Sequence, residues 1–235
     1  MKTIILAGGA GTRFTEETQF VPKPMIKIAD KPIIWHLMKI YADQGYKDFI
    51  IATGYKSEII HDWVERDLAE DWKVQAFYTG DQTSTGGRIK LCINKFNDPK
   101  FMLTYGDGLA NINIKKLLDF HEYHNKTCTV TAVRPPARYG SLKIMDGLVT
   151  KFNEKNQTDS GWINGGFFVV NQEIDNYINQ NDDLGFHVLP RLVLDSNLSA
   201  NKHYGFWHPM DSLREKKELE SILSTGNIPW SQIDQ

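Results

Sequence analysis

A glycine-rich segment near the N-terminus carries the strongest chemical signal in the sequence. Residues 6–13, Leu-Ala-Gly-Gly-Ala-Gly-Thr-Arg, continue a short apolar run that covers residues 3–6. Glycines let the main chain approach a ligand closely, and backbone N–H groups that follow a buried strand bind phosphate. Arg13 and Lys23 add fixed positive charge beside this loop. The pattern predicts that the loop binds a nucleoside triphosphate.

Two better-known phosphate-binding loops are excluded by the residues around these glycines. A Walker A loop requires a Lys-Ser or Lys-Thr pair after its last glycine, and residues 6–13 lack that pair. The dinucleotide-binding fingerprint requires a third glycine where this sequence has Phe14. A loop that only makes a tight connection after a strand stays open as the alternative.

Asp107 has a position that suits a metal ligand. It follows the apolar run at residues 101–104, and a glycine on each side leaves room for a metal ion and phosphates. Ligands of open α/β sheets gather at the carboxyl ends of the strands, which is where Asp107 is expected. The alternative is a turn aspartate that accepts hydrogen bonds from its own backbone.

Asp211 is the second candidate metal ligand, and it also suits a structural role. Ser212 and Glu215 have the spacing of a capping box, so Asp211 or Ser212 could cap the last helix. Two carboxylates, together with phosphate oxygens and water, suit octahedral magnesium. On the residues alone, both roles stay open for Asp211.

Two basic segments are candidates for contacts with the nucleotide. Lys23 lies between Pro22 and Pro24, which restrict the backbone and pre-organise the ammonium group; an exposed loop lysine is the alternative. Residues 85–88, Thr-Gly-Gly-Arg, place two glycines where a helix is expected to open, which suits an anion or a nucleobase. A surface loop is the alternative for this segment.

These residues would support transfer of a nucleotidyl group to a phosphate. In that reaction an oxygen of the acceptor phosphate attacks the α-phosphorus in line, and pyrophosphate leaves. Fixed cations and magnesium neutralise the charge that develops. No Ser-His-Asp or Cys-His arrangement is evident in the sequence, and this chemistry requires none.

Length and composition indicate an ordinary globular protein. The 235 residues suffice to bury a substantial core as one large domain, and the formal net charge of −2 gives no reason to expect a nucleic-acid partner. Cys92 and Cys128 lack metal or redox spacing, so we expect reduced thiols. No apolar segment approaches the roughly 18 residues of a membrane span, so we expect a cytoplasmic protein without a membrane partner.

Strand and helix patterns alternate along the first half of the chain, which predicts an α/β fold with a mainly parallel sheet. The polar segment at residues 79–87 is expected to be a loop. Strands are expected at residues 3–6, 49–52, 74–77, 101–104 and 127–133. Helices are expected from Pro32 to about Asp43, at 57–68, from about Arg88 to Phe96, and after the capping residue Asn113.

The second half of the chain has a different pattern. Short strands separated by turn signals are expected near 141–145, 147–153 and 163–170, as a smaller antiparallel or mixed addition beside the parallel sheet. Two helices and a short strand near 202–207 complete the chain. Because no linker divides the sequence, residues 1–235 are expected to form one domain. Its nucleotide-binding half would cover about 1–133 and its acceptor-binding half about 134–235.

Taken together, the motifs resemble those of the sugar-phosphate nucleotidyltransferases. Leu-Ala-Gly-Gly-x-Gly-Thr-Arg followed by Pro-Lys-Pro-Met is similar to the signature of that family. Further segments, in the family's order, are similar to one branch, the glucose-1-phosphate cytidylyltransferases. The resemblance implies a Rossmann-like, three-layer nucleotidyltransferase fold. The segments similar to that branch are residues 16–18, 31–36, 54–56, 85–90, 104–108, 163–168 and 205–211.

The resemblance also implies an activity and a set of site residues. It implies a magnesium-dependent cytidylyltransferase that transfers CMP from CTP to a sugar 1-phosphate such as glucose 1-phosphate, for capsule or O-antigen polysaccharide synthesis. Arg13, Lys23 and Asp107 would be catalytic, and Lys23 would bridge the α-phosphate and the acceptor phosphate. Asp107 and Asp211 would ligate Mg²⁺. The nucleotide would contact Leu6, Ala7, Gly8, Gly9, Gly11, Thr12, Arg13, Lys23, Gly54, Thr79, Thr85, Gly86, Arg88, Tyr105, Gly106 and Asp107.

On the acceptor side, the resemblance implies contacts from the second half of the chain. Lys155 suits the acceptor phosphate, while Glu154 and Asn164 suit hydroxyl groups; a solvated ion pair is the alternative for Glu154 and Lys155. Trp207 either forms a wall of the site or belongs to the core. The implied acceptor contacts are Arg138, Tyr139, Gly140, Glu154, Lys155, Asn164 and Gly165.

Two segments depart from the pattern of that branch. Between residues 56 and 79 the chain is shorter than its counterparts, whose extra stretch contributes subunit contacts, so a homo-oligomer is one of several open assemblies. Residues 185–190, Gly-Phe-His-Val-Leu-Pro, replace an acidic Trp-Glu-x-Glu segment. The acceptor could therefore be a non-sugar phosphate such as phosphoglutamine, for a capsule phosphoramidate, or the nucleotide a different triphosphate. A non-catalytic module that binds a nucleotide sugar is an alternative of another class.

Overall fold

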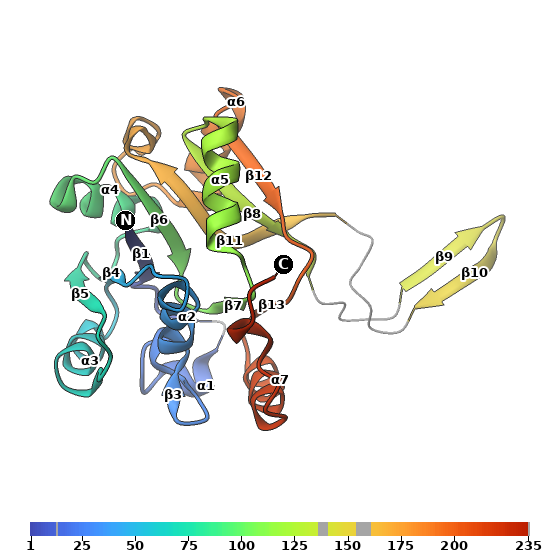
Figure 1. The fold of residues 1–235 in the computed structure, drawn as a ribbon, viewed down its shortest axis with the longest axis horizontal. Coiled ribbons are helices and arrows are strands. Elements are labelled where there is room, and N and C mark those ends of the chain that lie inside the picture. The colour runs from blue at the N-terminus through green and yellow to red at the C-terminus, as the bar shows by residue number, and fades with distance from the viewer. Residues whose placement is uncertain (13, 136–140, 154–160, 235) are drawn as a thin grey trace.

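A seven-stranded sheet forms the centre of the protein and positions the candidate residues (Figure 1). The computed structural model describes residues 1–12, 14–135, 141–153 and 161–234. In the order β12-β8-β11-β6-β1-β4-β5, all neighbours pair in parallel except β11, which is antiparallel to β6 and β8. The strands are β1 (Lys2–Ala7), β4 (Asp48–Thr53), β5 (Lys73–Tyr78), β6 (Lys100–Tyr105), β8 (Cys128–Val133), β11 (Ile163–Asn171) and β12 (Leu198–Lys202).

Helices cover both faces of this sheet and make two apolar clusters. Successive side chains of a strand point to opposite faces, so Ile5 of β1 joins the cluster with α2, α5 and α7, whereas Ile4 joins the cluster with α4 and α6. This three-layer arrangement follows from strands that are apolar on both faces. The helices are α1 (Thr15–Thr18), α2 (Ile33–Ala42), α3 (Ser57–Asp62), α4 (Thr85–Phe96), α5 (Ile114–His124), α6 (Leu189–Leu194) and α7 (Leu213–Ser224).

Three two-stranded ribbons accompany the main sheet. The most important for the site pairs β7 with β13, because it joins segments that are about a hundred residues apart in sequence. A second pairs β2 with β3, and a third is the hairpin of β9 and β10. Their bounds are β2 (Lys27–Ile28), β3 (Lys31–Pro32), β7 (Gly108–Ala110), β9 (Ser141–Met145), β10 (Leu148–Asn153) and β13 (Trp207–Pro209).

The structure confirms the α/β class and the mainly parallel sheet. It also confirms that Asn113 caps α5, because its side chain accepts a hydrogen bond from the amide of Lys116. The helix expected at 57–68 is an α-helix that ends at Asp62 and continues as one π-helical turn, Trp63–Asp67. The division into one domain with two halves stays a prediction.

Three expectations were wrong in detail. The strand expected near 163–170 is β11, which lies inside the main sheet because its apolar residues pack on both faces. The single strand expected near 202–207 is instead two strands, β12 and β13. The helix expected from Arg88 begins at Thr85, so the two glycines lie in its first turn. None of the helices in the described ranges is both long and apolar enough to cross a bilayer.

Candidate active site

A cavity of about 500 Å³ opens at the carboxyl ends of the parallel strands β1 and β6. This is the edge of the sheet where the glycine loop leaves β1 and where Asp107 follows β6. Most residues that the sequence predicts for the nucleotide lie on its walls. The lining residues are Leu6, Ala7, Gly8, Gly9, Gly11, Thr12, Phe14, Lys23, Pro24, Thr83, Ser84, Thr85, Arg88, Tyr105, Gly106, Asp107 and Asp183.

Arg88 fixes the backbone at the floor of this cavity. Its side chain, only 3% exposed, donates hydrogen bonds to the carbonyl oxygens of Gly8 and Thr53, each at 2.9 Å, and of Gly80 at 2.8 Å. A Cβ atom at Gly8 would lie 2.1 Å from the Arg88 Cζ atom, so glycine is required there. Burial lowers the pKa of Arg88, but a guanidinium stays protonated in proteins. Arg88 thus joins three segments, and the glycine loop is one of them.

Thr18 closes the far end of the glycine loop. Its hydroxyl donates to the carbonyl oxygens of Phe14 at 2.9 Å and Gly11 at 3.2 Å, and its side chain is buried. Gly11 has φ of +62°, a conformation that favours glycine. Tyr55 donates from its backbone amide to the Gly8 carbonyl at 3.1 Å. The Gly8 and Gly11 carbonyls are therefore both held by the protein.

Lys23 lies between the two candidate metal ligands. Its ammonium nitrogen is 2.5 Å from Asp107 Oδ2 and 2.5 Å from Asp211 Oδ1. The lysine side chain is 10% exposed, whereas the two carboxylates are 33% and 29% exposed. Burial by itself would lower the pKa of Lys23, but the hydrogen bonds and charges of Asp107 and Asp211 outweigh burial, and the pKa is raised. Lys23 is therefore a charged, buried residue of the site, and the exposed-loop alternative is wrong.

The ribbon of β7 and β13 brings Asp107 and Asp211 together. Asp107 directly precedes β7, in which Gly108 is paired with Pro209 of β13. The backbone amide of Met210 donates to the Asp107 carbonyl at 2.9 Å, which extends this pairing by one bond. The two aspartates are 104 positions apart in sequence, and backbone pairing makes them neighbours.

The capping alternative for Asp211 is resolved in favour of its neighbour. Ser212 is the N-cap of α7, and its side chain accepts a hydrogen bond from the amide of Glu215. Glu215 in turn accepts a hydrogen bond at 2.6 Å from the amide of Asp211, the residue before the N-cap, so the two side chains form a variant of the capping box. The box fixes the backbone of Asp211 and leaves its carboxylate to contact Lys23.

These carboxylates fit a magnesium site that substrate would complete. Two hard oxygen atoms from different segments converge on a single cation position, the one that the Lys23 ammonium occupies. Magnesium is commonly bound by one or two carboxylates together with substrate phosphates. Among the residues that the structure describes, no cluster of three or more His, Cys, Asp or Glu could hold a metal ion. Any such ion would need oxygen atoms from the ligand.

Three predicted nucleotide contacts lie behind the cavity wall. Gly54 is buried against the Arg88 guanidinium, and Thr79 accepts a hydrogen bond from it at 2.5 Å. Gly86 packs against residue Asp182, because a Cβ there would lie 2.5 Å from the Asp182 carbonyl oxygen. Both glycines of residues 85–88 are buried, so the surface-loop alternative is wrong. All three residues shape the wall from behind.

The acceptor-side residues are placed only in part. Among them, Arg138, Tyr139, Gly140, Glu154 and Lys155 lie outside the described residues, as does Arg13, which was predicted to contact the nucleotide. Asn164 and Gly165 begin β11, next to Tyr105 of the cavity wall, whose pKa burial raises to about 12. Trp207 donates from its indole nitrogen to the Gly165 carbonyl at 2.8 Å. Trp207 thus supports the wall near Gly165.

The sequence did not single out Asp183 as a site residue. Its carboxylate accepts hydrogen bonds from the Thr85 hydroxyl and the Phe186 amide, each at 2.9 Å. It lies at the cavity beside the helical turn Leu184–Val188, which belongs to the segment that departs from the family pattern. The departure of this segment from the family pattern was the one feature of the sequence that could have drawn attention to Asp183. Thr83 and Ser84 were anticipated only as members of a polar loop, and Phe14 and Pro24 as neighbours of charged residues.

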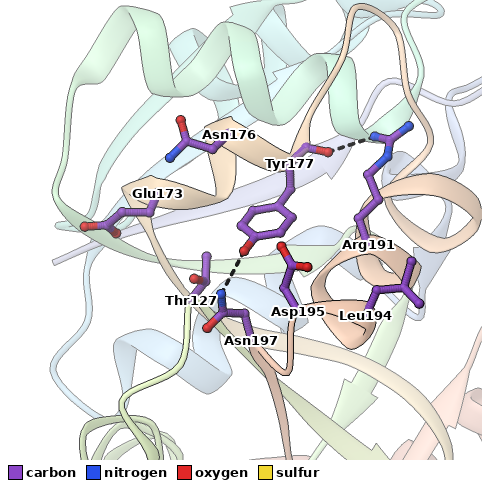
Figure 2. A pocket seen from close by; sticks show the side chains of 8 residues that line it. All are labelled: Thr127, Glu173, Asn176, Tyr177, Arg191, Leu194, Asp195 and Asn197. Carbon is purple, nitrogen blue, oxygen red and sulfur yellow. Dashed lines mark hydrogen bonds between the residues drawn. The ribbon is translucent and has the colours of Figure 1, made fainter.

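A second cavity, of about 610 Å³, lies at the opposite edge of the sheet (Figure 2). Thr127 and Asn197, which directly precede the parallel strands β8 and β12, contribute to it. Arg191 donates there to the Tyr177 carbonyl at 2.8 Å and pairs with Asp182. We call this hollow the distal cavity. Its lining residues are Thr127, Glu173, Asn176, Tyr177, Arg191, Leu194, Asp195 and Asn197.

Comparisons with known proteins identify the family of the chain. The nucleotidyl transferase family model matches residues 2–208. The chain is 42% identical to a glucose-1-phosphate cytidylyltransferase of Salmonella typhi, over 98% of both chains. It is 37% identical to a probable glucose-1-phosphate cytidylyltransferase of Bacillus subtilis, over 98% of this chain and 99% of the relative.

A solved structure has a similar fold. HddC from Yersinia pseudotuberculosis, complexed with GMP-PN, matches with a TM-score of 0.76 and 26% identity, over 94% of this chain and 99% of that chain. The chain therefore belongs to the nucleotidyl transferase family of enzymes, and its similarity to glucose-1-phosphate cytidylyltransferases confirms the resemblance that its motifs indicated.

Proposed function

We propose that the protein is a magnesium-dependent cytidylyltransferase that transfers CMP from CTP to glucose 1-phosphate and releases pyrophosphate. The observation that carries the proposal is the position of Lys23 between Asp107 and Asp211 at the wall of a glycine-lined cavity. In such a site the lysine would attract the phosphates of the two substrates, and the two carboxylates would bind a metal ion. Relatives named glucose-1-phosphate cytidylyltransferase, at 42% and 37% identity, support the choice of substrates.

The glycine loop would hold the triphosphate by its backbone. The carbonyl groups of Gly8 and Gly11 are bonded to the protein, which leaves the amide side of the loop to an anion. No side chain restricts access at Gly9, where an added Cβ would meet no atom within 4 Å. Backbone N–H groups at the end of a strand bind phosphate without the flexibility of long side chains. The loop would thereby orient the α-phosphorus for in-line attack.

Lys23 would neutralise charge where the two substrates meet. Its ammonium group can leave Asp107 and Asp211 for phosphate oxygens, because the lysine stem is long and flexible. A bound Mg²⁺, held by Asp107 and Asp211, would supply Lewis-acid stabilisation of the phosphate charge. Arg13, which follows the loop in sequence, is proposed to contribute a further positive charge to the triphosphate.

The proposal is tested by pyrophosphate release. CTP, UTP, GTP and dTTP would each be offered, with Mg²⁺, to glucose 1-phosphate, other sugar 1-phosphates, glycerol 3-phosphate and phosphoglutamine. Turnover of CTP with glucose 1-phosphate, and formation of CDP-glucose by mass spectrometry, is the expected result. If CTP reacted with phosphoglutamine alone, phosphoglutamine would be the acceptor in place of glucose 1-phosphate. The altered segment at 185–190 would then be the candidate cause of this change of acceptor. Absence of release with every pair would favour the non-catalytic module.

A further inference from the structure

In the part of the chain that the structure describes, Lys23 forms an ion cluster with two aspartates, because its ammonium group contacts both carboxylates. Both contacts to the ammonium nitrogen are 2.5 Å, and the lysine side chain is almost buried. Carboxylates held this close repel each other, so a positive charge between them is needed to keep them in place. The ammonium group of Lys23 places positive charge at that point.

The aspartates are held by backbone contacts that do not involve Lys23. Asp107 is fixed by the ribbon of β7 and β13 and by the bond from the Met210 amide. Asp211 is fixed by the capping box at the start of α7. Lys23, by contrast, reaches the pair through four methylene groups from the short 3-10 turn Lys23–Met25. The ammonium group is therefore the member of the cluster that can move away while the carboxylates stay.

The same position cannot hold an ammonium group and a divalent cation together. Each would lie within about 4 Å of the other, and charges of the same sign repel strongly at that distance in a partly buried site. A triphosphate in the adjoining cavity offers the ammonium group other oxygen atoms, since Lys23 lines that cavity. Binding of the nucleotide would then release the carboxylates.

We propose that Lys23 is an exchangeable counter-ion that occupies the divalent-cation position in the free protein and yields it when a triphosphate binds. This inference rests on the proposed function in one respect, namely that a triphosphate and a divalent cation are ligands of the same site. It predicts that the free protein binds divalent cations weakly and that a nucleotide strengthens that binding. By thermodynamic reciprocity the divalent cation strengthens nucleotide binding by the same factor.

The test measures Mn²⁺ binding to the nucleotide-free protein, by loss of the EPR signal of free Mn²⁺. Lys23→Met removes the charge and keeps a side chain of similar length. We expect this variant to bind Mn²⁺ at least about tenfold more tightly than the wild type, because two fixed carboxylates lose their competing cation. Adding Asp211→Asn to Lys23→Met should abolish the gain.

A matched control comes from a second partly buried lysine pair. Lys216 contacts Glu17 at 2.7 Å, and its side chain is 17% exposed. Lys216→Met should leave Mn²⁺ binding at the wild-type value. An equal gain in Lys216→Met would overturn the inference, and so would wild-type affinity in Lys23→Met. If Lys23→Met fails to fold, as judged by circular dichroism, Lys23→Gln gives the same comparison.

The outcome is independent of the substrate assignment. Transfer of CMP by the wild-type protein is measured separately, with the panel of phosphates described above. Transfer without any gain of Mn²⁺ affinity in Lys23→Met would refute the counter-ion role and leave the function standing. A gain of affinity without transfer to any phosphate would support the counter-ion role and refute the function.

Discussion

The two cavities lie at opposite edges of one sheet and use buried charge in different ways. In the first cavity, Lys23 is shared by two carboxylates, and Arg88 holds backbone carbonyls of the glycine loop. In the distal cavity, Arg191 contacts one carboxylate, that of Asp182. It also donates to the Tyr177 carbonyl (Figure 2). In the first arrangement one lysine contacts two carboxylates beside backbone groups of a loop, whereas in the second the arginine contacts a single carboxylate.

This difference shows why cavity size alone does not identify a site. The two cavities are of similar size, at about 610 Å³ for the distal cavity and about 500 Å³ for the first. The first cavity lies where parallel strands end, so that loops from separate strands converge there. It also contains glycines at positions with no room for a side chain, such as Gly8, where a Cβ would collide with Arg88. Equivalent substitutions in the two cavities should therefore have unequal effects on activity.

The largest effect is expected for Asp107→Asn. The amide keeps the shape of the side chain but removes the charge that faces Lys23, so CMP transfer should fall by about 10³-fold. Steady-state pyrophosphate release measures the rate, and a thermal melt checks the fold. Unchanged transfer in a folded Asp107→Asn protein would contradict the assignment of this cavity as the active site.

A smaller but decisive effect is expected for a pair of glycine variants. Gly8→Ala places a Cβ 2.1 Å from Arg88 Cζ, so we expect lower stability, by about 1–3 kcal/mol, together with weaker CTP binding. Gly9→Ala meets no protein atom within 4 Å, so the melting temperature should stay unchanged while CTP binding weakens. Melting curves and CTP titrations separate the two. Full CTP affinity in Gly9→Ala would show that the loop does not contact the nucleotide.

Matched arginine variants compare the two cavities directly. Arg88→Met removes the guanidinium donor from the carbonyls of Gly8, Thr53 and Gly80, although the amides of Tyr55 and Thr79 still donate to the first two. A hydrogen bond to a charged group contributes about 1.5–3 kcal/mol, so KM for CTP should rise by about tenfold or more. Arg191→Met removes a partly exposed pair whose contribution is at most about 1 kcal/mol, so activity should stay within about twofold. Comparable kinetic losses in both variants would invalidate the distinction.

The smallest effect concerns pH and stability away from the active site. His121 is buried and contacts Thr129 Oγ1 at 2.8 Å and Asn171 Oδ1 at 3.2 Å. Burial lowers its pKa below the ordinary value of 6.5, so the unfolded chain binds its proton more readily. The free energy of unfolding should therefore decrease as pH falls below about 6.5, and less steeply in His121→Asn. Denaturant titrations at pH 7.5 and 5.5 give the two slopes; identical slopes would contradict this role.

Much of the fold followed from the sequence because local patterns and tertiary structure agree. The apolar strands at 49–52 and 101–104 and the helix after Pro32 were predicted close to their observed bounds. The start of the helix Thr85–Phe96 was predicted three residues too late, because glycines normally disfavour a helix. Here they permit close packing on Asp182, a contact across almost a hundred residues that no local pattern reports.

The sequence by itself determined the family, and it singled out the glycine loop, Lys23, Asp107 and Asp211 as candidates for phosphate and metal binding. Residue types at short spacing suffice for these conclusions, because loop geometry and charge are local properties. Only the tertiary structure decided that Lys23 joins the two aspartates, that Ser212 rather than Asp211 caps α7, and that Arg88 holds the loop from behind. Each of these depends on contacts between segments distant in sequence, above all the pairing of β7 with β13, and such pairing is fixed by the packing of the whole chain.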